Sequence, residues 1–473
     1  MMEIPCGMQE QFLEAKQLIE SSNDIKIYTH TDCDGICSGA ILSIILDRLN
    51  KDYEIEFVNL DEIEDLDLDH KLTIFSDLGS GQGVDKNAKD GQKILILDHH
   101  PPLRDINYKN DKAYTYLEIN PMFYGIDGSY YVCGGGLCYF LAKTFGFKDL
   151  SWIGVLSAIG DMQNNKTGHF EGLNEIIQED AINEGLLKVT KNDLNIYGRS
   201  TRPLYVALSY FSDVKLPTTN NQQEAKVVLE ELGVDEKHNR KTLSEVTEED
   251  KMEIKKFLSR MISKRVPPKY LKYVPKLIVG DAYTFLNEEE GSFLRDGSEF
   301  STAMNACGRN RKEAIGVDII KGDRLVALDA LEEVSKTHRY NLATSISKVA
   351  DNYHSEIIEL DNFQYFDCSD FDEDIASNII GTITGMVLGY CNWKKPILGF
   401  SKPKNNQIKV SLRCSKLLAY DGIHFGNMIR EIAKEVGGTG GGHAIACGAY
   451  IPNEKKSEFL DKFNRKLQGK IAN

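Results

Sequence analysis

Acidic and histidine side chains recur at the ends of short apolar segments in the first third of the chain. Carboxylates combined with imidazoles suit Mn²⁺ or a similar divalent ion. Several carboxylates crowded together would repel one another without cations between them, which favours a site for two ions. Two such ions can clamp a phosphate and activate a water for hydrolysis. The residues fall into four groups, which are His30, Asp32 and Asp34; Asp77; Asp98, His99 and His100; and Asp161.

Each of these residues alone has a simpler interpretation. An aspartate or histidine at the end of a strand often caps the helix that follows. For any single residue that interpretation is the better one. For the whole set taken together, a metal site is the better interpretation.

The apolar segments that precede these residues predict a mostly parallel sheet. Strands that alternate with helices are typical of such sheets, in which function collects beyond the carboxyl ends of the strands. We therefore expect the four groups to meet at one edge. The segments expected to be strands, each ending in a polar cluster that a helix follows, are IKIYTH (25–30), KLTIFSD (71–77), KILILD (93–98) and IGVLSAIGD (153–161).

Bulk properties limit the classes of protein. A chain of 473 residues is too long for one core, so two or three domains are expected. The net charge of −15 argues against a general nucleic-acid coat. Two runs, 255–276 and 394–416, nevertheless carry only basic charges. Each is either a local basic track or a solvated face.

Cysteine usage and hydropathy indicate a cytoplasmic protein. The ten cysteines are scattered, with no CxxC pair, and are interpreted as reduced buried thiols. The amino-terminal residues lack the basic start and apolar run of a signal peptide. No stretch approaches 18 uncharged apolar residues, so no membrane association is expected.

Eight segments resemble known families. HTDCDG, SDLGSG, LDHHPP and AIGDMQ resemble the four motifs of the DHH phosphoesterase superfamily. TGHFEGLN, IYGRSTRPLYVALSY, MNACGR and GGTGGGHAIACGAYIP are similar to segments of archaeal RecJ-like nucleases. The resemblance covers nearly the whole chain and is weakest across 215–300. It implies an α/β fold, with a parallel-sheet DHH domain joined through helices to a smaller α/β DHHA1 domain.

The resemblance also implies roles for the clustered residues. Asp77 would bridge two divalent ions. Mn²⁺ is the expected metal, with Mg²⁺ or Co²⁺ as alternatives. His100 would face the scissile phosphate and stabilise charge or protonate the leaving oxygen. Asp98 would orient a histidine from behind the ligands. The implied metal ligands are His30, Asp32, Asp34, Asp77, His99 and Asp161.

Glycine clusters are the next candidates. Gly35 would let a helix begin close to the metals. Gly134, Gly135 and Gly136 would either line the site with backbone N–H groups or form a tight turn before a helix, and both interpretations stay open.

A second glycine cluster lies near the carboxyl terminus. Gly440, Gly441, Gly442 and His443 resemble the GGGH loop of DHHA1 domains, which holds substrate. Arg413, in VSLRCSK, matches the arginine of that domain and would grip a phosphate. Without the resemblance, the glycine run would be a plain flexible loop.

Arg202, Asn305 and Arg309 are lesser candidates for nucleic-acid contact. A salt bridge or a turn anchor explains them equally well.

The predicted domain plan has five parts, and the cleft between the two major domains is expected to hold substrate. The parts are a DHH catalytic domain (1–220), a helical insertion (221–300), a return to the DHH domain (301–330), a helical linker (331–353) and a DHHA1 domain (354–473).

The predicted function is that of a single-strand exonuclease acting on DNA or RNA in replication or repair and releasing mononucleotides. Among archaeal RecJ-like proteins, the GINS-associated type works 5′ to 3′ and is favoured here. The Hef-associated type works 3′ to 5′. A phosphodiesterase for cyclic dinucleotides or short oligoribonucleotides is an alternative, although the large insertion favours a longer substrate. The other alternative is a replisome scaffold with residual nuclease activity. The oligomeric state is left open.

Overall fold

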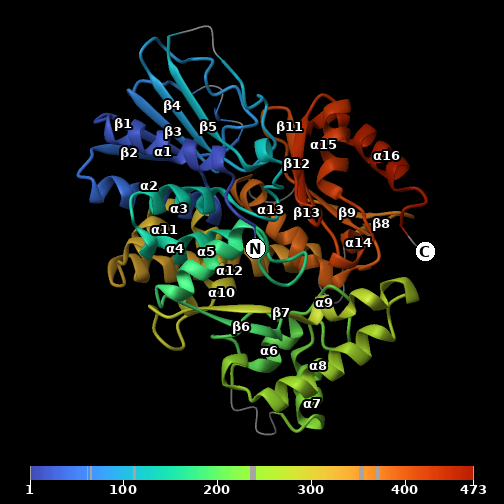
Figure 1. Cartoon of the computed structure of the whole chain (residues 1–473). Coiled ribbons are helices and arrows are strands. Elements are labelled where there is room, and N and C mark those ends of the chain that lie inside the picture. The colour runs from blue at the N-terminus through green and yellow to red at the C-terminus, as the bar shows by residue number, and fades with distance from the viewer. Residues whose placement is uncertain are drawn as a thin grey trace. The chain divides into compact units, whose positions relative to one another are not determined.

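The computed structural model describes residues 2–60, 62–63, 66–109, 113–234, 241–350, 356–368 and 373–471. The chain forms two compact units (Figure 1). The first unit comprises Met1–Asn192 and Asp281–Ser335, and the second comprises Asp193–Gly280 and Lys336–Asn473. No helix among the described residues is both long and apolar enough to cross a membrane.

A five-stranded parallel sheet organises the first unit, as predicted. Its strand order is β2-β1-β3-β4-β5. Every residue of β3 is buried, which is typical of a parallel strand covered on both faces. The strands are β1 (Ile25–His30), β2 (Tyr53–Val58), β3 (Leu72–Ser76), β4 (Lys93–Leu97) and β5 (Thr115–Ile119).

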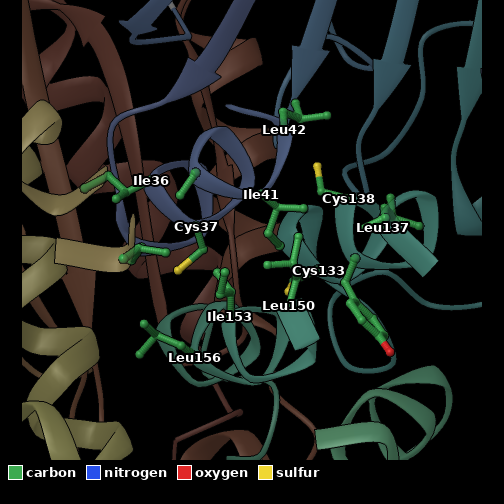
Figure 2. Close-up of a cluster of buried hydrophobic side chains, with 14 of the residues drawn as sticks. Ile36, Cys37, Ile41, Leu42, Cys133, Leu137, Cys138, Leu150, Ile153 and Leu156 are labelled. Carbon is green, nitrogen blue, oxygen red and sulfur yellow. The ribbon is translucent and has the colours of Figure 1, made fainter. Parts of the chain in front are cut away.

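Helices of the first unit pack into one large hydrophobic core. Figure 2 shows side chains of α2, α3 and α4 meeting there, with Cys37, Cys133 and Cys138 among the aliphatic residues. The helices are α1 (Cys6–Glu20), α2 (Cys33–Arg48), α3 (Gly134–Thr144), α4 (Ser151–Gly160), α5 (Leu173–Asn183), α10 (Gly297–Arg309) and α11 (Glu313–Lys321), followed by α12 (Val326–Val349), which runs from the first unit into the second.

The prediction of a strand at 153–161 was wrong, because this segment forms most of α4, which ends at Gly160. Asp161 follows as the C-cap of the helix. All residues of α4 except the last are buried, so the segment lacks the polar face that marks a helix. Gly154 allows close packing, since a Cβ there would lie 2.9 Å from Ile177.

Helices were also expected after the strands ending at Asp77 and Asp98. Among the described residues, 77–92 and 98–109 form turns and loops instead. The glycines of LGSGQG and the two prolines after His100 favour turns over helix.

The second unit combines two stretches of chain around one core. Residues of 194–278 and of 363–471 belong to the same hydrophobic cluster, which includes Leu229, Phe257, Phe363 and Phe425. The predicted domain bounds stay predictions, but the structure adds that the segment before Gly280 packs with the carboxyl-terminal part of the chain.

A six-stranded mixed sheet lies in this unit, in the order β12-β13-β11-β10-β9-β8. A separate pair joins β6 (Leu187–Leu194) to β7 (Val279–Phe285), and most residues of these two strands belong to the first unit. The strands of the larger sheet are β8 (Ile358–Glu359), β9 (Gln364–Asp367), β10 (Ile397–Phe400), β11 (Gln407–Arg413), β12 (Thr439–Gly442) and β13 (Ala446–Pro452). The helices are α6 (Leu204–Ser209), α7 (Gln222–Glu231), α8 (Glu248–Ser263), α9 (Val274–Ile278), α13 (Glu373–Val387), α14 (Lys416–Tyr420), α15 (Phe425–Glu435) and α16 (Lys456–Leu467).

Candidate metal centre

Three adjacent strands bring the predicted ligands together. β1, β3 and β4 are neighbours in the parallel sheet, so their carboxyl ends meet at one edge. His30 ends β1, Asp77 follows β3, and Asp98 follows β4. Asp32 caps α2 by accepting a hydrogen bond from Gly35 N at 3.1 Å. Asp32 is therefore both a helix cap and a member of the cluster.

All eight acidic and histidine residues singled out in the sequence lie in this cluster. Their ligand atoms form three overlapping groups, in each of which the atoms lie within 4.8 Å of one another. The groups are His30, Asp32 and Asp77; Asp34, His99 and Asp161; and Asp77, Asp98, His99 and His100.

Asp77 joins the groups through its two carboxylate oxygens. Its Oδ1 lies 3.2 Å from His99 Nε2, and its Oδ2 lies 3.6 Å from His30 Nδ1. The residue is only 2% exposed, and Oδ2 is buried without a hydrogen-bond partner. Because buried carboxylate oxygens are normally satisfied, this atom fits a site that a cation completes. Its φ of 57° is a strained conformation typical of functional sites.

The electrostatics of the cluster support the same conclusion. Burial raises the pKa of Asp77 well above its ordinary value, and the nearby Asp34 and Asp32 carboxylates add to the shift. Burial would lower the pKa of His99, but Asp161, Asp77 and Asp34 outweigh it and raise that pKa well above its ordinary value. When no cation is bound, protons therefore neutralise part of the negative charge of this site.

The first turn of α3 holds Asp34. Gly134 N and Gly135 N donate to its two oxygens at 2.8 and 2.7 Å, and the Ser157 hydroxyl donates to Oδ1. A Cβ at Gly134 would lie 2.6 Å from Asp77 Cβ. The glycine run thus begins a helix and also directs backbone N–H groups at a predicted ligand.

The three residues of the triplet Asp98-His99-His100 have different environments. His99 Nδ1 lies 2.7 Å from the Gly128 carbonyl oxygen, so Nδ1 carries the proton and Nε2 faces Asp77 and Asp34. Asp98 is fully buried and accepts from Ser80 N at 2.9 Å. Its Oδ1 lies 2.7 Å from His100 Nδ1, and the pKa of Asp98 is lowered because His100 outweighs the effect of burial. The His100 side chain is 43% exposed and can meet substrate.

A second layer of polar residues, to which the sequence assigned no role, orients the ligands. Gln163 Nε2 donates to Asp161 Oδ2 and to the Gly128 carbonyl, both at 2.8 Å. One amide thus steadies Asp161 directly and His99 through the shared carbonyl. Gln163 stands within the AIGDMQ motif, which is a signal in the sequence. Gly128 has no such signal, because its need for glycine arises from the fold: a Cβ there would lie 2.0 Å from His99 O.

Asn120, at the end of β5, supports the triplet from the other side. Its Nδ2 donates to Ser80 Oγ at 2.9 Å and to the His100 carbonyl at 2.8 Å. It is fully buried. Asn120 and Ser80 together fix the backbone that carries His100.

Helix α10 buttresses the loop that carries Asp32. Asn305 Oδ1 accepts from Cys33 N at 3.0 Å. Burial would raise the pKa of Asp32, but His30 and, to a smaller extent, the positive charge of Arg309 outweigh it and lower that pKa. Gly308 is packed so closely that a Cβ would lie 1.7 Å from Thr31 O. Asn305 and Arg309 are therefore near the cluster, while their contact with nucleic acid stays a prediction.

The candidates of the second unit gather at one end of its sheet. Arg413, at the end of β11, pairs with Ala446 of β13, and His443 N donates to Ala446 O at 2.9 Å. Gly440, Gly441 and Gly442 form β12 alongside β13. The run is therefore an edge strand instead of a plain flexible loop.

Arg413 and Arg430 lie near this end of the sheet. Arg413 lies against α13, where a Cβ at Gly381 would be 2.9 Å from its Nη2. Arg430, which the sequence did not single out, lies beside Gly441 and donates to Asn427 Oδ1 at 2.8 Å. Arg202 belongs to a turn in the same unit, where its aliphatic carbons pack on Gly198.

Three family models match the chain. The N-terminal domain of the DHH family matches residues 24–155, the DHH-CID domain matches 196–274, and the DHHA1 domain matches 361–469. An uncharacterized protein of Methanocaldococcus jannaschii is 30% identical over 446 residues, which are 93% of this chain and 92% of that protein.

Solved structures share the fold. CDC45 from Entamoeba histolytica matches 98% of this chain and 99% of its own, with a TM-score of 0.61 and 14% identity. RecJ from Thermus thermophilus, solved in complex with Mn²⁺, matches 99% of this chain and 55% of its own, with a TM-score of 0.54 and 13% identity. The matched domains and the relative that aligns over most of both chains agree, and the chain belongs to the DHH/DHHA1 family.

Proposed function

We propose that this protein is a metal-dependent exonuclease that hydrolyses single-stranded DNA or RNA and releases mononucleotides. The observation that carries the proposal is Asp77, whose two oxygens face two groups of ligand atoms beside the exposed His100. RecJ structures of Thermus thermophilus hold Mn²⁺ or Mg²⁺. We therefore assign two divalent ions to this protein, with Mn²⁺ first and Mg²⁺ or Co²⁺ as alternatives.

The residues divide into two sets around Asp77. His30, Asp32 and Asp77 would hold one ion, and Asp34, His99 and Asp161 would hold the other beside Asp77. Such ions, when bound, neutralise phosphate charge and lower the pKa of a water.

The protein's own groups supply the remaining chemistry. His100 is held by Asp98 at Nδ1, so its ring is oriented for one task at the other nitrogen. That nitrogen would stabilise charge on the phosphate or give a proton to the leaving oxygen. In the second unit, Arg413, the strand Gly440–Gly442 and His443 would bind the phosphate and sugar of the terminal nucleotide.

Single strands labelled at either end test the proposal. We expect immediate mononucleotide from the 5′ label in Mn²⁺, as for a GINS-associated type. Mononucleotide appearing first from the 3′ label would instead favour the Hef-associated type and its partner. The variant His100→Ala should lose most activity, whereas His70→Ala is the matched control, because His70 pairs with Asp24 away from the cluster. Turnover of a dinucleotide with no cleavage of longer strands in any metal would overturn the exonuclease and support the small-substrate phosphodiesterase.

The fold match to CDC45 favours a second candidate, a scaffold role in replication. A complete ligand cluster supports catalysis in addition to scaffolding. If Asp77→Asn abolishes metal binding and hydrolysis together, scaffolding alone is excluded.

A further inference from the structure

Two tyrosines from distant parts of the chain meet on the second unit. Tyr273, just before α9, and Tyr420, at the end of α14, have ring centroids 5.5 Å apart with planes inclined by 40°. Both side chains are partly exposed, and both also pack against the hydrophobic cluster of the second unit. Tyr273 lies within the basic run 255–276. Tyr420 lies shortly after the basic run 394–416, which contains Arg413.

One ion pair and one hydrogen bond hold the segments that carry these rings. Lys269 Nζ lies 2.6 Å from Asp421 Oδ2, which ties the segment before α9 to the end of α14. Lys416 N donates to Asp213 Oδ1 at 3.0 Å, which anchors the start of α14. These contacts connect the segment before α9 to α14.

Lysines lie over the rings. Lys272 Nζ is 4.7 Å from the centroid of the Tyr273 ring, and Lys276 Nζ is 5.7 Å from that of Tyr420. Both lysines are exposed, and no carboxylate of the described residues lies within 4.0 Å of either ammonium group. Their positive charges are therefore not neutralised by ion pairs and are available to an anionic ligand.

We propose that Tyr273, Tyr420, Lys272 and Lys276 form a contact surface for single-stranded nucleic acid. Aromatic rings on which bases stack, combined with cations that meet the backbone, are the recurrent means of holding single strands without sequence preference. The inference deepens the proposed function, because it places a contact on the strand apart from the terminal nucleotide assigned to Arg413.

Chain order supports this placement. Arg413 ends β11 and α14 begins only three residues later, so the two contacts are consecutive along the same stretch of the second unit. A strand whose end is held at Arg413 could continue across α14. Duplex DNA is less suited, because its bases are stacked on one another and present no free faces to the tyrosines.

The test compares the full chain with Tyr273→Ala/Tyr420→Ala and with Lys272→Gln/Lys276→Gln. Affinities for oligothymidylate and oligouridylate of about 30 nucleotides are measured by fluorescence anisotropy in a chelator, so that nothing is cut. We expect the tyrosine variant to bind at least about fivefold more weakly. We expect the lysine variant to make the negative slope of log K against log salt shallower by about 1.4. If the variants lose affinity for only one of the two oligonucleotides, the surface binds DNA in the case of oligothymidylate and RNA in the case of oligouridylate.

The matched controls are Tyr205→Ala and Lys226→Gln. Lys226 Nζ lies 4.5 Å from the Tyr205 ring centroid in the same unit, and the described residues place no second ring against Tyr205. Tyrosine and lysine variants that bind like these controls would overturn the inference. A tyrosine variant that binds like the parent while the lysine variant loses affinity would also overturn the inference. The lysines would then act by charge alone, as in a surface that binds an acidic protein segment.

Activity measurements separate this inference from the proposed function. If both hold, the variants raise KM for the long strand and leave dinucleotide turnover unchanged. If the parent binds single strands through these residues but cuts none, the exonuclease proposal fails and the surface stands. If the parent cuts strands and the variants behave as the controls, the surface fails alone.

Discussion

Oδ1 of Asp77 lies 3.2 Å from Nε2 of His99, and neither side chain is more than 2% exposed. The contact places a buried carboxylate against an imidazole whose other nitrogen is committed to the Gly128 carbonyl. It is central to the cluster, because the remaining oxygen of Asp77 is left for the group around His30.

Asp77→Asn should separate metal binding from folding. Burial and the repulsion of Asp34 and Asp32 raise the pKa of Asp77, so its ionised form opposes folding at neutral pH when no cation is present. The metal-free variant should therefore melt at or above the temperature of the parent. The rise in melting temperature on adding Mn²⁺ should disappear, and hydrolysis should fall by at least about 100-fold.

Asp52→Asn is the control, since Asp52 is exposed in the same unit. A metal-free Asp77→Asn protein that melts well below the parent would show that the carboxylate is structural and contradict this assignment.

Gln163→Ala should weaken the metal site without touching a ligand. Its amide holds both Asp161 and the carbonyl that orients His99, and removal of such supporting groups costs about 10–100-fold in metal affinity or activity. Titration of Mn²⁺ by calorimetry measures the loss. The control Gln9→Ala removes an exposed amide that bonds only the Ile4 carbonyl. Equal Mn²⁺ affinity in both variants would argue against the supporting role.

Gly308→Ala should displace the loop that carries Asp32. The added methyl would lie 1.7 Å from Thr31 O, and overpacking of this kind costs about 3 kcal/mol. Thermal unfolding should show the destabilisation, and Mn²⁺ binding should weaken in the fraction that folds. Thr302→Ala is exposed on the same helix and should change neither quantity. An unchanged melting temperature for Gly308→Ala would mean that α10 does not pack against the loop as described.

Asp193 should stabilise the second unit in a pH-dependent way. Burial would raise the pKa of Asp193, but Arg199, the Leu194 N–H and Lys251 outweigh it and hold that pKa below its ordinary value. A depressed carboxyl pKa contributes stability that is complete above the unfolded pKa of about 3.9 and is lost as the pH falls through the folded pKa. Asp193→Asn should therefore cost about 3 kcal/mol at neutral pH, with the difference from the parent narrowing below about pH 4.

The two tryptophans of the chain make this measurable, because Trp393 lies in the second unit and Trp152 in the first. Urea unfolding followed by Trp393 fluorescence in a Trp152→Phe background reports on the second unit. Glu248→Gln is the control, since Glu248 pairs with Lys251 but is largely exposed. A difference that stays constant down to pH 3 would refute the assigned titration.

The sequence by itself determined which residues form the cluster and which family the chain belongs to. Strands that end in His30, Asp77 and Asp98 must meet if the sheet is parallel, so local patterns sufficed for the α/β fold and for the convergence of these ends. The glycine run at 134–136 was left between two interpretations, because sequence does not reveal that its N–H groups face Asp34.

Only the tertiary structure decided the rest. A helix that is buried all round, such as α4, has the same apolar pattern as a buried strand, and packing against α2 and α3 settles the difference. The need for glycine at Gly128, the support of His100 by Asn120 and the meeting of Tyr273 with Tyr420 depend on contacts between residues far apart in the chain. Such contacts leave no local pattern, because each residue is ordinary in its own segment and acquires its role only when the chain is folded.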